Sequence, residues 1–117
     1  PYVITGINVI IAETDAAAQR LSTSLIQLIY GLFTGKRQAV QPPTDMTPYF
    51  EQILQHPQVQ QMLKYSFIGS KATVKAQVQE FMEQTQADEL IVVTNIYDIN
   101  DRIRSYELFA EIMQELT

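Results

Sequence analysis

The stretch that decides the fold is YVITGINVIIA at residues 2–12. It is almost continuously apolar and rich in β-branched residues, which is typical of a strand covered on both faces, as in a parallel sheet. A helix follows directly, because Thr14 and Asp15 supply a capping hydroxyl and a first-turn negative charge, and Gly35 ends the pattern. Its apolar positions recur three and four residues apart, at Ala18, Leu21, Leu25, Leu28, Ile29 and Leu32. The sequence therefore predicts a strand followed by a long helix.

The same order of strand and helix recurs twice. SFIG at 66–69 predicts a short strand, and Ser70 is placed to cap a helix. The apolar stripe of that helix is Val74, Val78, Phe81 and Met82. ELIVVT at 89–94 predicts the clearest buried strand, and a last helix follows it. We expect one side of the last helix to consist of Ile99, Ile103, Tyr106, Ala110 and Met113.

The segment between the first two units differs in composition. Residues 35–48 contain three prolines and a glycine, which indicates a surface connection. Residues 49–64 have a helical pattern, but the residue before a proline avoids the α region, so we expect a break at His56. His56 is the only histidine, and we interpret it as a surface or capping residue. The glutamines of 52–61 indicate a solvated helix face.

Three strand–helix units predict an α/β fold with parallel strands and right-handed crossovers. Three strands alone leave open edges, so we expect the C-terminal three β/α units of a (β/α)8 TIM barrel of about 250 residues. On this interpretation residues 1–117 are a fragment of a longer domain. Residues 35–65 then form a proline- and glutamine-rich insertion between β/α units.

Composition excludes several classes of partner. Eight Lys and Arg against 13 Asp and Glu give a formal net charge of −5, which disfavours nucleic acid. No apolar run approaches the ~20 residues that cross a bilayer, and no signal peptide is evident. There are no cysteines, so disulfides and thiolate metal sites are excluded. We expect a cytoplasmic protein with no membrane partner and no bound metal.

Residues at the ends of the predicted strands are the candidates for a binding site. Thr94 and Asn95 end the third strand, where a barrel builds its active site, although turn formation alone also explains them. Gly69 and Ser70 open a helix whose N–H groups could hold a phosphate, and helix capping is the alternative. These four are our cofactor-binding candidates. Asn8, the one amide in the first strand, either lines the barrel interior or ties strands together.

Other charged residues have simpler explanations. Arg102 and Arg104 lie near a strand end and could meet an anion, but pairing with nearby carboxylates explains them as well. Those carboxylates are Asp98, Asp101 and Glu107. We interpret Asp88–Glu89 as capping the start of a strand rather than as a catalytic pair, because neighbouring strand residues point to opposite faces. No standard catalytic motif is present, so the catalytic residues are not predicted.

Three blocks of the sequence resemble bacterial luciferase-like flavin-dependent monooxygenases. They are INVIIAETDAAAQRL at 7–21, YSFIGSKATVKAQVQEF at 65–81 and ADELIVVTNIYDINDRIRSYELFAE at 87–111. The resemblance implies FMN at the C-terminal ends of barrel strands, where it reacts with O2 to oxidise a small organic substrate. It also implies a reductase that supplies reduced flavin. The family's principal flavin contacts come from earlier strands, which this chain does not contain.

Two other interpretations stay open. The chain could be a non-catalytic α/β module that associates with itself, or a luciferase relative that only binds flavin. Open sheet edges and uncovered apolar faces lead us to expect a homo-oligomer.

Overall fold

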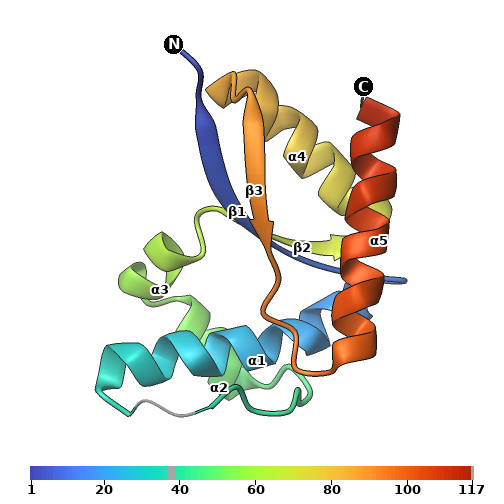
Figure 1. Cartoon of the computed structure of the whole chain (residues 1–117). Coiled ribbons are helices and arrows are strands. Elements are labelled where there is room, and N and C mark those ends of the chain that lie inside the picture. The colour runs from blue at the N-terminus through green and yellow to red at the C-terminus, as the bar shows by residue number, and fades with distance from the viewer. Residues whose placement is uncertain (37–38, 117) are drawn as a thin grey trace.

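The computed structural model describes residues 1–36 and 39–116, and three parallel strands form its centre (Figure 1). These are β1 (Ile4–Ala12), β2 (Ser66–Ser70) and β3 (Glu89–Val93). The sheet order is β2-β1-β3, so the first strand is central. β2 pairs with the C-terminal half of β1, and β3 pairs with its N-terminal half. The three predicted strands and their parallel direction are confirmed.

Five helices accompany the strands within the described residues. They are α1 (Asp15–Thr34), α2 (Pro48–Leu54), α3 (Pro57–Met62), α4 (Lys71–Thr85) and α5 (Ile99–Leu116). The predicted ends of α1 are confirmed, since the Thr14 side chain accepts a hydrogen bond from the Ala17 N–H and Gly35 adopts φ 77°. The connection predicted at 35–48 has no regular structure at the described positions before Pro48, and residues 37–38 lie outside them.

The predicted break at His56 separates α2 from α3. His56 caps α3, because its Nδ1 accepts a hydrogen bond from the Gln58 N–H at 3.3 Å. Its ring packs edge-on against Phe33, with 4.5 Å between the ring centroids. The glutamines of this segment are exposed, as expected. His56 therefore has the capping role that its position before a proline predicted.

The sheet is covered on both faces, and β1 contributes to two separate cores. Ile7, Val9 and Ile11 point to the face covered by α4 and α5. Ile10 points to the opposite face, where it packs with residues of α1, α2 and α3. Alternation along a strand explains this division, because successive side chains point to opposite faces. The result is three layers, with helices on both sides of the sheet.

This architecture differs from the expected arc of a barrel. Three consecutive barrel strands would place the second strand in the middle and all helices on the outer face. Here the first strand is central, and α1 lies on the other side of the sheet from α4 and α5. From β1 the chain goes to β2 on one side of β1, and it then crosses to β3 on the other side of β1. The described residues thus form a doubly wound α/β unit.

Two expectations about buried faces were wrong. In α5 the buried residues are Ser105, Leu108, Phe109 and Ile112. Ile99, Ile103 and Tyr106, predicted to face the core, are 61%, 51% and 42% exposed. β3 is buried on one face only, since Ile91 and Val93 are 58% and 51% exposed. Ile91 and Val93 lie on the sheet face opposite to Leu90 and Val92, which pack against the core formed with α4 and α5.

Candidate functional site

The strands β1 and β3 part at their carboxyl ends. Their pairing stops at Asn8 and Val93, whereas β1 continues beside β2 to Ala12. The chain then leaves β3 through residues 94–98 and enters α5 (Figure 1). In doubly wound sheets, ligands bind at the carboxyl ends of strands where the strand order reverses. The gap between β1 and β3 is therefore the place to look for a site.

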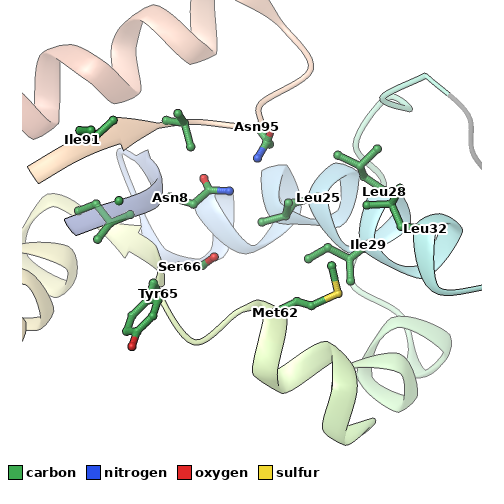
Figure 2. A pocket seen from close by; sticks show the side chains of 13 residues that line it. Asn8, Leu25, Leu28, Ile29, Leu32, Met62, Tyr65, Ser66, Ile91 and Asn95 are labelled. Atoms are coloured by element: carbon green, nitrogen blue, oxygen red, sulfur yellow. The ribbon is translucent and has the colours of Figure 1, made fainter. Parts of the chain in front are cut away.

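An open cavity of about 400 Å³ lies on the sheet face next to this gap (Figure 2). This volume is in the range that holds small organic ligands. Its apolar wall includes Leu25, Leu28, Ile29, Leu32, Ile91 and Val93. None of the described side chains that line it belongs to an acidic residue, a basic residue or histidine. The lining of the cavity is thus uncharged and mainly apolar.

Polar side chains gather at one level of this apolar wall. Asn8 is paired in register with Ser66 on β2 and with Val93 on β3, and it is the one residue of β1 that the two registers share. Figure 2 shows Asn8, Asn95 and Ser66 around the middle of the cavity. Asn8 Oδ1 is buried with no hydrogen-bond partner among the described residues. Such an atom costs about 1–3 kcal/mol, which a suitable partner would recover.

The two candidates at the end of β3 lie at or beside this cavity. Asn95 is half-buried and lines it, together with Asn8 from the first strand. Thr94 is buried at 8% exposure, and its Oγ1 has no hydrogen-bond partner within the described chain. The structure therefore brings Asn8 and Asn95 together, with Thr94 adjacent in the chain. Their role in cofactor binding stays a prediction.

The other two candidates, Gly69 and Ser70, lie at the junction of β2 and α4, outside this cavity. Ser70 caps α4 through its side chain, as the alternative interpretation predicted. Its backbone N–H donates to Asp15 Oδ1 at 2.7 Å, and this hydrogen bond lowers the pKa of the Asp15 carboxyl. A phosphate would have to displace this carboxylate. Cofactor binding by Gly69 and Ser70 stays a prediction.

A second hollow, of about 320 Å³, lies at the C-terminal end of β1. Its charged lining residues are Glu13, Arg20, Asp101 and Arg104. Arg104 Nε lies 2.8 Å from Glu13 Oε1 and its Nη1 lies 3.7 Å from Glu107 Oε1, while Arg20 Nε lies 3.3 Å from Asp45 Oδ1. The pairing of Arg104 with Glu107 was predicted, and its shorter contact with Glu13 was not. This hollow holds paired charges.

Arg102 does not follow its expected pairing. Its Nε is buried with no hydrogen-bond partner in the part of the chain that the structure describes. Asp98, one of its predicted partners, instead accepts hydrogen bonds from the backbone N–H groups of Asn100 and Asp101, at the start of α5. Asp98 therefore caps the helix, which leaves Arg102 without that carboxylate.

The acidic pair at the start of β3, Asp88 and Glu89, is structural, as predicted. Asp88 Oδ2 accepts a hydrogen bond from the Val3 N–H at 2.7 Å, and Glu89 Oε2 accepts one from the Tyr2 hydroxyl at 3.1 Å. Across residues 1–36 and 39–116, no three His, Cys, Asp or Glu residues are grouped so that they could hold a metal. No helix in those ranges has the length and apolar character to cross a membrane.

The geometry defines an α/β protein with an apolar cavity at the reversal point of a doubly wound sheet. Over 99% of its length the chain is 34% identical to a luciferase-like monooxygenase of Escherichia coli (strain K12), of which it covers 35%. It is also 34% identical to the protein YddN of Bacillus subtilis (strain 168), of which it covers 34%. Over nearly its whole length the chain is thus similar to about a third of a luciferase-like monooxygenase, the kind of protein that the three sequence blocks resemble.

A solved structure shares the fold. The crystal structure of apo-MsnO8 matches 97% of this chain with a TM-score of 0.76 and 30% sequence identity, and the match covers 35% of the MsnO8 chain. No protein-family model matches. The chain spans about a third of the length of the curated relatives that it matches.

Proposed function

We propose that this chain forms part of a flavin-dependent monooxygenase that uses O2 and reduced FMN to oxidise a small organic substrate. The observation that carries the proposal is the apolar cavity beside Asn8 and Asn95, in a chain homologous over nearly its whole length to a luciferase-like monooxygenase. When bound, the flavin supplies the redox chemistry. The residues of this chain orient the bound molecules and exclude water.

The cavity has the chemistry to hold a flat ring system. Leu28 and Leu32 of α1 and Val93 of β3 offer an apolar wall, and the flavin ring has two largely apolar faces. The ring edge carries alternating hydrogen-bond donors and acceptors, which the amides of Asn8 and Asn95 can match. A phosphate at Ser70 would have to displace the Asp15 carboxylate from the Ser70 N–H. Residues outside this cavity would hold the phosphate.

The proposal also accounts for the exposed surface. The curated relatives are about three times as long as this chain. We place the remaining part of such an enzyme against the open side of the cavity and the free edge of β3, where Ile91 and Val93 are exposed. These strands would join a larger sheet or barrel there. A separate reductase would supply the reduced flavin.

A chimeric enzyme tests this proposal. The matching third of the Escherichia coli luciferase-like monooxygenase is replaced by this chain, and FMN binding is measured by absorbance and fluorescence. O2 uptake is then followed after photochemical reduction of the flavin. We expect FMN binding and O2 uptake, and Asn8→Asp should weaken FMN binding because it places a charge in the apolar wall. Asn100→Asp, the same change on the exposed surface of α5, is the matched control.

The result that contradicts the proposal is a folded chimera that neither binds FMN nor consumes O2, while the unaltered Escherichia coli protein does both under the same conditions. Circular dichroism and gel filtration establish that the chimera is folded.

A second candidate is a module that associates with itself. Specific observations favour it: β2 and β3 are both edge strands, and Ile91, Val93 and Ile103 are exposed. Exposed apolar groups beside a free edge promote strand pairing between copies. Light scattering over a hundredfold range of concentration tests this candidate. A dimer that binds no flavin favours it, whereas a monomer at all concentrations removes it.

A further inference from the structure

We infer that a second copy of this chain docks on α5, so that the two α5 helices pack side by side and run in parallel. The inference does not depend on flavin binding, because the surface that carries it lies outside the cavity. It also differs from strand pairing at the sheet edges, because the contact joins two helices. Three features of α5 support it: an exposed apolar stripe, the spacing of that stripe, and the charges on its flanks.

The first feature is an apolar stripe of α5 that the fold leaves exposed. The helix lies at the outside of the molecule, in the same layer as α4 (Figure 1). Its buried face consists of Ser105, Leu108, Phe109 and Ile112. The exposed stripe, on another face, consists of Ile99, Ile103, Tyr106 and Ala110. A contiguous row of exposed apolar side chains is typical of an interaction surface, whereas single ones are common on any protein.

The spacing of this exposed stripe is that of a coiled-coil seam. Its residues follow one another at intervals of four, three and four, which are the a and d positions of a heptad repeat. Two helices with such seams pack at a shallow angle with interlocking side chains. A free peptide with so short a seam would not stay helical, because helix formation has its own cost. The core already holds α5 in its helical form, so the contact has only to bring two copies together.

Opposite charges flank the exposed stripe and select the parallel orientation. Arg102 occupies the g position just before Ile103, and Glu107 occupies the e position just after Tyr106. In parallel helices, a g residue lies next to the e residue that is five positions further along the other helix. Arg102 of each copy would therefore meet Glu107 of the other copy, and two-fold symmetry forms this pair twice. An antiparallel arrangement would not bring these two residues together.

Both flanking side chains are available for this contact. Arg102 is half-buried and forms no ion pair with another residue of the ranges 1–36 and 39–116. Of its guanidinium nitrogens only Nε is buried without a partner, which leaves Nη1 and Nη2 to reach a second copy. Glu107 is exposed, and its Oε1 lies 3.7 Å from Arg104 Nη1. Arg104 has a shorter contact of 2.8 Å with Glu13, so Glu107 can turn to a second copy at little cost.

Analytical ultracentrifugation of the purified chain, over a wide range of concentration, tests the contact. We expect a reversible equilibrium between monomer and dimer. Ile103→Glu should leave only monomer, because a carboxylate buried in the contact would lose its water without gaining a counter-charge. Ile91→Glu is the matched control, since it makes the same change at an exposed isoleucine of β3, and it should leave the dimer intact. Circular dichroism verifies that both variants are folded.

An exchange of charges tests the orientation. Arg102→Glu and Glu107→Arg each place like charges opposite one another twice in the parallel dimer. Each should weaken dimerisation roughly two- to thirty-fold, the effect of two exposed ion pairs. The double variant restores opposite charges and should recover most of the lost affinity. If Arg102→Glu does not fold, Glu107→Arg, at an exposed position, makes the test alone.

Cross-linking tests the orientation independently. The chain has no cysteine, so Ile99→Cys and Ala110→Cys each introduce a single thiol. In a parallel pair every residue of the stripe lies opposite its own copy, so both variants should form disulfide-linked dimers when oxidised by oxidised glutathione. The two positions lie about 16 Å apart along the helix, so an antiparallel pair cannot join both of them to their own copies. Gln79→Cys, at an exposed position of α4, is the control and should stay monomeric.

Three results would overturn the inference. The first is a monomer at every concentration, which would assign the stripe to a different partner, such as the rest of a longer protein. The second is a dimer that Ile91→Glu dissociates and Ile103→Glu does not, which would favour strand pairing at β3. The third is cross-linking at only one of positions 99 and 110, or at neither. Flavin binding by the chimera is measured separately, so the failure of either proposal leaves the other standing.

Discussion

The hydroxyl oxygen of Ser105 accepts a hydrogen bond from the backbone N–H of Ile11 at 3.0 Å, and both residues are buried. β3 pairs with β1 only as far as Asn8, so beyond that point β1 has no strand on this side. Ser105 supplies the partner that a neighbouring strand would otherwise give. The parting of β1 and β3, which creates the candidate site, is thus stabilised from α5.

Removal of this partner should destabilise the fold. Ser105→Ala leaves the buried Ile11 N–H without an acceptor, which costs about 1–3 kcal/mol in the free energy of unfolding. Ser22→Ala is the control, because the buried Ser22 hydroxyl donates only to the Gln19 carbonyl of its own helix. Urea denaturation of both variants measures the difference. Equal stability of the two would show that Ser105 does not serve as this partner.

The two glycines of the strands should respond differently to alanine. A Cβ at Gly69 would lie 2.8 Å from Thr73 Cγ2 and 2.9 Å from Asp15 Oδ1, whereas a Cβ at Gly6 meets nothing within 4 Å. We expect Gly69→Ala to lower the free energy of unfolding by about 1–3 kcal/mol and Gly6→Ala to leave it nearly unchanged. Thermal unfolding compares them, and a fully stable Gly69→Ala protein would contradict the close packing at this junction.

The hydrogen bond between Asp15 and Ser70 predicts a pH dependence. It lowers the pKa of the folded carboxyl below 3.8, so folding favours the ionised form. The contribution is complete well above pH 3.8 and is lost as the pH falls through the folded pKa. Wild-type Tm should therefore fall more steeply below about pH 4 than the Tm of Asp15→Asn. Glu115, with a pKa of about 2, titrates in both proteins, so the difference between the curves is the measurement. Parallel curves would contradict the prediction.

The buried face of α5 can be tested by two substitutions. Ile112 is fully buried and Ile103 is 51% exposed. Ile112→Ala should cost about 2–5 kcal/mol in the free energy of unfolding, and Ile103→Ala less than about 1 kcal/mol. Chemical denaturation measures both. If Ile103→Ala destabilised the protein more than Ile112→Ala, the helix face predicted from the sequence would be the buried one.

Local signals in the sequence predicted local structure well. The side chains of Thr14 and Ser70 each accept a hydrogen bond from a backbone N–H in the first turn of a helix. Gly35 ends a helix because it adopts a positive φ. Both effects act within a few residues. The order of the strands could not be predicted in this way, because pairing between β1 and β3 joins residues about 85 positions apart. The face of α5 was also missed, since two overlapping apolar stripes have the same helical period.

The candidate site was predicted only in part. Asn8 and Asn95 were identified because a polar residue within or just after an apolar strand is conspicuous. Leu28 and Leu32 were predicted only as part of the apolar stripe of their helix, and nothing in their spacing distinguishes a cavity wall from a packed interior. Ser66 was missed because its role depends on its pairing with Asn8 across the sheet.

The division of β1 between two cores also limits how its length can vary. Inserting or deleting one residue near Val9 would exchange the two faces for every position beyond it, removing Ile10 from one core and Ile11 from the other. Residues 39–47, before α2, have no such alternation, so a change in length there would not exchange buried and exposed faces. Among natural variants of this protein, gains and losses of residues should therefore collect before α2 and be absent from β1.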